Sequence, residues 1–183
     1  MTSFYTKEEL NILGFKHVGE NVHISRKASI YGPNRMSFGN NVRIDDFCIL
    51  SGDITLGSNI HIGAYCGLYG ADGIVMEDYT GLSPRCTLFS ATDDFSGDFL
   101  ISPMSPDEYC NVTGGRILIK KYAQIGSGTT IMQNLTIEEG VAVGAMSFVN
   151  RSLDEWTIYA GIPVRRIKER KRGLLKFFED EKR

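Results

Sequence analysis

The chain has 183 residues, 42% of them hydrophobic, and a formal net charge of −2. This length suffices for one domain with a substantial core, and the small net charge excludes bulk electrostatic attraction to nucleic acid or to anionic membranes. Residues 1–10 are too polar for a signal peptide, and no apolar run approaches the roughly 20 residues that span a bilayer. We therefore expect one cytoplasmic domain over residues 1–183, with no membrane span.

The first expected element is a short helix within residues 2–15. Thr6 is a suitable N-cap, and Glu9 stands three residues later, where it completes a capping box. Gly14 follows the apolar residues of this segment and suits the left-handed conformation that ends many helices. These three residues fix the expected ends of the helix.

An aliphatic residue then recurs at every sixth position, and three hexads make a unit of 18 residues, so that residues 38–42 resemble residues 56–60. An amphipathic helix repeats every three or four residues and a half-buried strand every second, so neither explains the period. A fixed short period indicates stacked units. We predict triangular coils of three short strands, with the aliphatic residues inside and neighbouring coils paired about 4.8 Å apart.

Three cysteines support this register. Cys48, Cys66 and Cys86 are 18 and 20 residues apart, at the fifth position of their hexads, and we expect them to form a buried column. A metal site is the alternative, but no histidine or second cysteine stands at ligand spacing, and we expect no metal. Cys110 has no evident partner, and four cysteines without a disulfide framework fit a reducing compartment.

The repeat covers residues 17–89, stops, and resumes over residues 116–163. Residues 90–115 contain no hexads, and a segment this long inside a compact repeat domain is usually functional. We predict that it is an active-site loop. Residues 164–183, which follow Pro163, are mostly charged, and we expect them to form a C-terminal helix.

The hexads, the mid-stack loop and the closing residues 159–165 together resemble the left-handed β-helix acyltransferases over nearly the whole chain. Residues 4–10 and 43–52 are similar to the galactoside-acetyltransferase-like branch, which includes acyltransferases of nucleotide-linked amino-dideoxy sugars for surface polysaccharides. The resemblance implies an all-β, left-handed parallel β-helix, a homotrimer with the active site between subunits, and acetyl-CoA as cosubstrate. The left hand comes from the resemblance, because crossover physics alone favours right-handed connections.

In the sugar O-acetyltransferases of this fold, a histidine of the mid-stack loop acts as the base, and the resemblance puts Asp93 at that position. An unperturbed aspartate, with a pKa of about 3.9, is a weak base for a hydroxyl, whereas a neutral amine attacks without prior deprotonation. The missing histidine therefore favours an amino sugar. Asp93 and Asp94 are candidates for the proton acceptor, although a solvated turn would also carry them. His61, expected to point outward between Ile60 and Ile62, is a third candidate or else an interface residue.

Further residues are candidates for binding the acceptor. Asp45 and Asp46 form a second acidic pair at a coil corner, where they either pair with an amino group or stabilise the corner. Tyr65 and Tyr69 are expected near the acidic loop and suit sugar faces and hydroxyls. Packing between subunits is the alternative role for both tyrosines.

For coenzyme A, the resemblance implies that the Ser127 N–H binds the thioester oxygen and that Ala145, one coil on, lines the pantetheine channel. Asn150 and Arg151 fall where family members contact the nucleotide end. Arg165 and Lys168 suit the phosphates electrostatically, although a solvated basic segment would also contain them.

The sequence thus predicts an acetyl-CoA-dependent acyltransferase that N-acetylates a nucleotide-linked amino-dideoxy sugar. The alternatives are a sugar O-acetyltransferase of the galactoside or maltose type and a non-catalytic β-helical scaffold. A zinc carbonic anhydrase needs three converging histidines, which the spacing here does not offer. Serine acetyltransferases of this fold have a long helical N-terminal domain, which this chain does not show.

Overall fold

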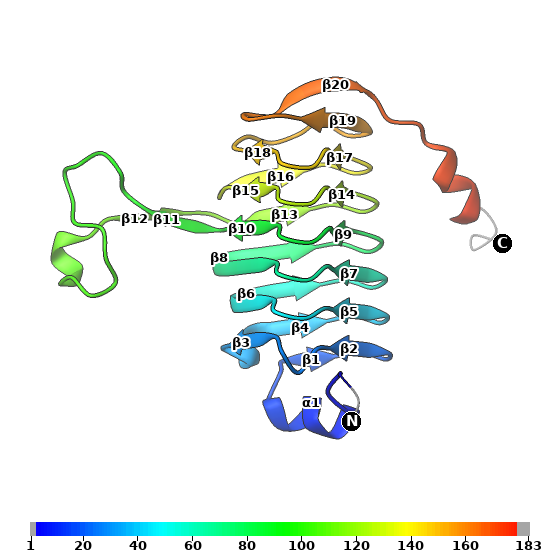
Figure 1. Cartoon of the computed structure of the whole chain (residues 1–183), viewed down its shortest axis with the longest axis horizontal. Coiled ribbons are helices and arrows are strands. Elements are labelled where there is room, and N and C mark those ends of the chain that lie inside the picture. The colour runs from blue at the N-terminus through cyan, green and yellow to red at the C-terminus, as the bar shows by residue number, and fades with distance from the viewer. Residues whose placement is uncertain (1–2, 179–183) are drawn as a thin grey trace.

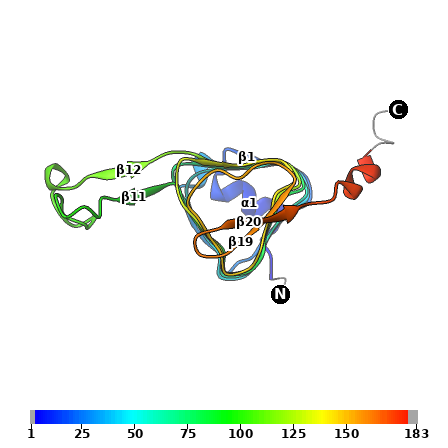
Figure 2. The same ribbon diagram turned by 90° about the horizontal axis from the view of Figure 1, so that it is seen from above.

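The computed structural model describes residues 3–178 and is a triangular column of stacked coils (Figures 1 and 2). Along the column axis, the coils superpose as one triangle, from which a long loop leaves at one corner and the C-terminal segment at another (Figure 2). Each side of the triangle is a stack of parallel strands. We number these stacks as faces 1, 2 and 3, in the order in which the chain visits them.

The strands are short, and two of them bend around the corner between faces 3 and 1 and so belong to both. These two are β6 (Ile49–Leu56) and β8 (Gly67–Met76). Face 1 also contains β1 (His17–Val18), β4 (Met36–Phe38), β13 (Ile117–Ile119) and β16 (Leu135–Ile137). Face 2 contains β2 (Val22–Ile24), β5 (Val42–Ile44), β7 (Ile60–Ile62), β9 (Gly81–Leu82), β14 (Gln124–Ile125), β17 (Ala142–Val143) and β19 (Thr157–Ala160). Face 3 also contains β3 (Ser29–Tyr31), β10 (Thr87–Phe89), β15 (Thr130–Ile131) and β18 (Phe148–Val149).

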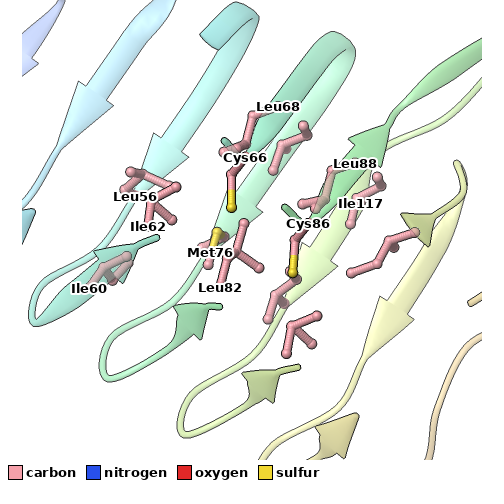
Figure 3. Close-up of a cluster of buried hydrophobic side chains, with 14 of the residues drawn as sticks. Leu56, Ile60, Ile62, Cys66, Leu68, Met76, Leu82, Cys86, Leu88 and Ile117 are labelled. Atoms are coloured by element: carbon pink, nitrogen blue, oxygen red, sulfur yellow. The ribbon is translucent and has the colours of Figure 1, made fainter. Parts of the chain in front are cut away.

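The aliphatic position of each hexad points into the triangle, as the period predicts. On face 2 this column consists of Ile44, Ile62, Leu82, Ile125 and Val143, each no more than 4% exposed. Successive members are partners in neighbouring parallel strands, and Figure 3 shows part of the resulting core. Burying one such side chain fully contributes about 1.5–3 kcal/mol. Because each coil contacts only its neighbours, stability accumulates by stacking.

The predicted cysteine column is confirmed. Cys48, Cys66 and Cys86 are at most 1% exposed, and each Sγ donates to a backbone carbonyl at 3.2 Å. Cys110 is half-buried in the loop, 3.5 Å from the Ser102 carbonyl. Within residues 3–178, no group of three or more histidine, cysteine, aspartate or glutamate side chains is arranged to hold a metal ion.

The N-terminal helix, α1, spans Lys7–Leu13. Its predicted capping box is confirmed, since Glu9 N donates to Thr6 Oγ1 and Thr6 N donates to Glu9 Oε2. Gly14 ends the helix in the left-handed conformation, with φ of 78°. Arg26, in the first coil, donates to both oxygens of Glu9 at 2.6 and 2.8 Å. The helix is therefore tied to the base of the column.

The predicted C-terminal helix over residues 164–183 is wrong in its first part. Arg165–Glu169 is a strand, β20, which pairs antiparallel with β19. The pairing satisfies the edge of the last face 2 strand, which would otherwise be open. Arg170 then donates to the carbonyls of Tyr122, Gly140 and Val141. A 3₁₀ helix, η3 (Gly173–Phe178), follows, and residues 179–183 of the predicted helix lie outside the described residues.

Phe178 of this 3₁₀ helix packs against the column, with its ring 4.7 Å from Tyr79 and 5.1 Å from Tyr122 between centroids. The mid-stack loop instead projects from the column (Figure 1). Its base is an antiparallel hairpin of β11 (Ala91–Asp93) and β12 (Val112–Gly114). Two further 3₁₀ turns are η1 (Pro33–Arg35) and η2 (Asp107–Tyr109). No helix within residues 3–178 is long and apolar enough to cross a membrane.

The Glu9–Arg26 contact predicts an acid-sensitive contribution to stability. The hydrogen bonds from Arg26 and from the Thr6 backbone lower the pKa of Glu9 from 4.5 to about 2. Because the folded-state pKa is the lower one, the contribution is complete above pH 4.5 and is lost as the pH falls towards about 2. Glu9→Gln should therefore reduce stability at neutral pH and flatten the stability loss in this acid range. Urea unfolding of both proteins across the range tests this, and parallel profiles would contradict it.

Candidate active site

The outward side chains of face 2 also form a column, because its strands pair in register. From the bottom to the top of the stack this column runs through His23, Arg43, His61, Gly81, Gln124, Ala142, Ile158 and Lys168. Five strand spacings separate His61 from Lys168, or roughly 24 Å. Face 2 therefore offers an extended surface parallel to the column axis.

His61 is held on this surface by an acidic partner. Its Nε2 lies 2.8 Å from Asp45 Oδ2, and Arg43 Nε donates to Asp45 Oδ1 at 2.7 Å. Burial raises the pKa of Asp45, but the hydrogen bonds from Arg43 and His61 outweigh it and hold the pKa below its usual value. Because a carboxylate only accepts hydrogen bonds, Nε2 of His61 carries a proton, and Nδ1 is the acceptor of the neutral ring.

Two hollows meet at the His61–Asp45 pair. One is lined by His61 together with Asn59, Gln124 and residues 80–84. A Cβ at Gly81 would come within 2.8 Å of Gln124 Oε1, so a side chain at this position would displace the Gln124 amide that lines the hollow. The other hollow is lined by Ser3, Phe4, Lys27, Arg43, Asp45, Asp46 and Ala64.

Asp46, the second member of the predicted acidic pair, makes local contacts. It accepts from Ser25 Oγ at 2.5 Å and from Lys27 Nζ at 3.0 Å. The Ser25 hydrogen bond first, and the Lys27 contact second, hold the pKa of Asp46 below its usual value. These contacts fit the corner-stabilising alternative for Asp46, and both Asp45 and Asp46 line the second hollow.

The corner between faces 2 and 3, which we call corner A, presents unpaired backbone donors. It comprises residues 45–47, 63–65, 83–85, 126–128 and 144–146. In the described part of the chain, the N–H groups of Ser127 and Ala145 donate to no protein acceptor, although the residues after them both donate down the stack. These two N–H groups lie one coil apart, at the edge of face 2. They can therefore bind two successive acceptors of an extended ligand.

Bulky side chains occupy the left-handed position of corner A. Phe47, Tyr65, Arg85 and Met146 have φ between 53° and 65°, where a residue other than glycine or asparagine costs about 1–2 kcal/mol. Phe47 and Tyr65 stack with centroids 4.9 Å apart, and the Arg85 guanidinium lies 5.9 Å from the Tyr65 ring. Phe47 and Tyr65 remain 47% and 55% exposed. The side chains of these four residues are all exposed and are therefore available for a contact outside the chain.

The two predicted phosphate ligands share one side of β20. Arg165 pairs with Ala160, and Lys168 pairs with Ile158. Residues three apart on a regular strand would face opposite sides, but a bulge between these pairs restores the alignment. Both cations consequently lie on the outer side of face 2, above Ser127 and Ala145.

The other predicted residues gather at the corner between faces 3 and 1, which we call corner B. Asp93 ends β11 and Asp94 follows it, while Asn150 and Arg151 directly follow β18. Tyr69 stacks on Phe89 just before the loop, with centroids 5.1 Å apart. The prediction that Tyr65 also lies near the loop is wrong. Tyr65 lies at corner A, whereas the loop leaves the column at corner B, at the other end of face 3. One chain therefore divides the predicted site between two corners.

Asp94 organises the loop in this chain. Its carboxylate accepts from Ser96 N at 2.7 Å and from Asn111 Nδ2 at 2.9 Å. The hydrogen bonds from Ser96, followed by that from Asn111, hold the pKa of Asp94 below its usual value. The Asp93 carboxylate, in contrast, makes no hydrogen bond or ion pair within residues 3–178. Of the two carboxylates, that of Asp93 is therefore the one without a partner in the described chain.

Sequence reasoning missed Phe47, Arg85, Ser83 and Gln124. The first two carry only a weak signal in the sequence, because bulky residues also occupy left-handed positions elsewhere in the column, as at Tyr79, Tyr122 and Trp156. Ser83 and Gln124 carry no such signal. Their place in the His61 hollow follows only from the register of the coils.

No protein-family model matches the chain. The dTDP-4-amino-4,6-dideoxy-D-glucose acyltransferase of Escherichia coli is 41% identical over 170 residues, which are 91% of this chain and 88% of that protein. AntD, an N-acyltransferase from Bacillus cereus in complex with dTDP and 3-hydroxybutyryl-CoA, is 53% identical, with a TM-score of 0.95 over 99% of this chain and 97% of AntD. A maltose O-acetyltransferase from Clostridium difficile 630, at 21% identity and a TM-score of 0.59 over 91% of this chain and 75% of that one, shares the fold alone.

The fold and these relatives define a left-handed parallel β-helix acyltransferase, which confirms the predicted fold class and enzyme class. Within that class, the chain belongs to the family of dTDP-4-amino-4,6-dideoxy-D-glucose acyltransferases. The resemblance stated from the sequence is thereby confirmed.

The left-handed strain at corner A predicts that the fold does not depend on the aromatic side chain of Tyr65. Tyr65→Asn should leave the free energy of unfolding within about 0.5 kcal/mol of wild type or raise it, because relief of left-handed strain offsets the lost stacking. Tyr79→Asn is the matched control, since Tyr79 is also left-handed, with φ of 58°, but packs on Phe178 and Tyr122. The control should lose about 1–2 kcal/mol. Urea unfolding compares them, and equal losses would contradict the assignment.

Proposed function

We propose that the chain is an acetyl-CoA-dependent N-acyltransferase that acylates the amino group of dTDP-4-amino-4,6-dideoxyglucose. The observation that carries this is the similarity to AntD over 99% of the chain. A serine-to-alanine variant of AntD binds that sugar nucleotide and coenzyme A, and it matches this chain with a TM-score of 0.96 at 53% identity. The proposed setting is surface-polysaccharide synthesis, such as that of the lipopolysaccharide O-antigen, in the cytoplasm.

The reaction needs a stabilised oxyanion and a route for one proton. The amine nitrogen forms a bond to the thioester carbonyl carbon, the tetrahedral oxyanion accepts a hydrogen bond from the Ser127 N–H, and the C–S bond then breaks. Products are the amide and the thiol of coenzyme A. The proton lost from nitrogen passes to an acceptor and ends on the departing sulfur, so no external base is consumed.

Asp93 is the proposed proton acceptor or orienting group. It is the residue of the acidic loop pair whose carboxylate has no partner within residues 3–178, whereas Asp94 is occupied by the loop. His61 is the alternative acceptor, because its Nδ1 faces no protein partner in the described chain while Asp45 holds Nε2. Asp45, Asp46, Tyr65 and Tyr69 remain the proposed contacts of the sugar nucleotide.

Coenzyme A is proposed to lie along face 2. The Ser127 and Ala145 N–H groups would hold the thioester and pantetheine, and Arg165 and Lys168 would meet phosphate groups above them. All four lie on one continuous surface, and Asn150 and Arg151 of a neighbouring subunit would contact the nucleotide end. Acetyl is the proposed acyl group, and a longer chain, such as the 3-hydroxybutyryl group in the AntD complex, is the alternative.

We further propose a homotrimer in which corner A of one subunit meets corner B of the next. Contact between two different surfaces closes into a ring when the rotation fits, and a triangular column suits threefold rotation. The loop carries exposed apolar side chains that call for a partner, namely Phe95, Phe99, Leu100, Ile101, Met104, Tyr109 and Val112. No nucleic acid partner and no metal cofactor is proposed.

The substrate proposal is tested by incubating the pure protein with acetyl-CoA and an acceptor panel while following thiol release. Turnover is expected with dTDP-4-amino-4,6-dideoxyglucose, and not with UDP- or GDP-linked amino sugars, galactosides or maltose. Turnover confined to galactosides or maltose would overturn N-acylation in favour of the O-acetyltransferase alternative. If no acceptor gives thiol release and the protein does not bind coenzyme A, the result would favour a non-catalytic scaffold.

The oxyanion role predicts a sharp effect of proline at one position. Ser127→Pro deletes the N–H, and the fold should tolerate it because Pro84 occupies the equivalent position one coil below. Loss of one oxyanion donor should lower kcat by about 10²–10³-fold. Ser127→Ala, which keeps the N–H, should retain kcat within a few-fold. Equal kcat in the two variants, both with wild-type melting behaviour, would exclude this N–H as the donor.

The phosphate role predicts unequal effects along β20. Arg165→Ala and Lys168→Ala should each weaken acetyl-CoA binding by about tenfold, the loss of one charge-assisted contact of ~1.4 kcal/mol. Arg166→Ala is the matched control, because Arg166 pairs with Tyr159 on the opposite side of the strand. Isothermal titration measures the three affinities. A loss in the control as large as in the other two would point to general charge rather than to a phosphate site.

A further inference from the structure

The inner cysteine column reaches the backbone of corner A. Cys48, Cys66 and Cys86 donate from Sγ to the carbonyls of Gly63, Ser83 and Gly126 respectively, each at 3.2 Å. One coil higher, Thr129 stands at the same inward position and its Oγ1 donates to the Gly144 carbonyl at 3.3 Å. Figure 3 shows the sulfur atoms of Cys66 and Cys86 among the buried aliphatic side chains.

These contacts fix the direction of a peptide plane. In a trans peptide the C=O and the following N–H point in opposite directions. A Gly126 carbonyl turned inward to Cys86 therefore turns the Ser127 N–H outward, and the Gly144–Thr129 contact does the same for the Ala145 N–H. The inward carbonyl and the outward N–H group are the two ends of one peptide unit.

Backbone hydrogen bonds hold the N–H groups of Gly126 and Gly128, and within the described chain the Gly126 carbonyl itself accepts from the Cys86 thiol. Gly126 carries no side chain, and it cannot acquire one, because a Cβ would come within 2.5 Å of Ala145 N. A glycine backbone has the widest conformational range, and a buried carbonyl without a donor is unfavourable. The Cys86 thiol, which is fully buried, supplies that donor from inside the column.

The same contact has no such consequence one coil lower. Cys66 donates to the Ser83 carbonyl, but the next nitrogen belongs to Pro84, which carries no N–H. The chain thus contains an internal control, in which the inner hydrogen bond is made but aims no donor at the surface.

We propose that Cys86 is a positioning residue for acyl transfer: through the Gly126 carbonyl, its thiol aims the Ser127 N–H at the thioester oxygen. This rests on the proposed function, in which that N–H stabilises the oxyanion. Cys86 does not touch the substrate and undergoes no chemistry. Threonine is the conservative replacement, since Thr129 performs the equivalent contact in the next coil.

The test compares two replacements of one shape. Cys86→Thr keeps a donor and Cys86→Val replaces it with a methyl group, and the same pair is made at Cys66 as the control. Cys86→Val should lower kcat at least about tenfold relative to Cys86→Thr, with the KM for acetyl-CoA within a few-fold, because the oxyanion forms only in the transition state. The Cys66 pair should differ in stability but not in kcat. Equal kcat for the two Cys86 variants, or an equal loss in the Cys66 pair, would overturn the proposal.

A second readout separates this inference from the proposed function. The ¹⁵N–¹H resonance of Ser127 reports the orientation of its peptide whether or not turnover occurs. It should shift between the Thr and Val variants at Cys86 and stay in place for the pair at Cys66. An inactive wild type that shows this shift would overturn the proposed function alone, whereas an unchanged resonance would overturn the positioning role.

Discussion

Parallel pairing of successive coils in strict register is the constraint on which the rest of this molecule depends. The pairing stacks equivalent hexad positions into columns. One position forms the aliphatic core, and a second forms the inner column of thiols and hydroxyls. A third forms the row of outward side chains on face 2. The outward side chains of face 2 therefore form a surface parallel to the column axis as a direct result of the repeat. Two positions interrupt the columns: the mid-stack loop, which carries the proposed proton acceptor Asp93, and Pro84, which presents no N–H at corner A.

Corner A shows how the fold and the site share the same peptide units. Carbonyls that turn inward to buried donors release N–H groups to the outside, so the interior chemistry of the column sets the donors available at its surface. The same peptide units therefore have two roles: their carbonyls bind the buried donors that stabilise the corner, and their N–H groups are the proposed donors to the oxyanion. The exposed aromatic residues Phe47 and Tyr65 lie at the same corner and are available for the proposed contact between subunits.

Much of the fold was predictable from the sequence, because a six-residue period predicts a triangular coil, although not its hand, and Thr6, Glu9 and Gly14 act locally. The strand at residues 165–169 was not, because a charged segment is compatible with a helix and its strand conformation depends on pairing with the open edge of β19. The site was predictable only residue by residue. Tyr65 was misplaced because neighbouring hexads face different corners, and the division of the site between corners A and B follows from the closed triangle, which no single motif encodes.

The central claim is that an active site forms only where corner A of one subunit meets corner B of the next. It is tested most directly by complementation between a corner A variant, Ser127→Pro, and a corner B variant, Asp93→Ala combined with Arg151→Ala. The two are co-expressed with different tags, and the mixed assemblies are isolated through both tags. A mixed trimer contains one junction with two intact halves, so the account predicts about one third of wild-type kcat from two variants that are each inactive. Mixed assemblies no more active than the separate variants would contradict it and place the site within a single chain.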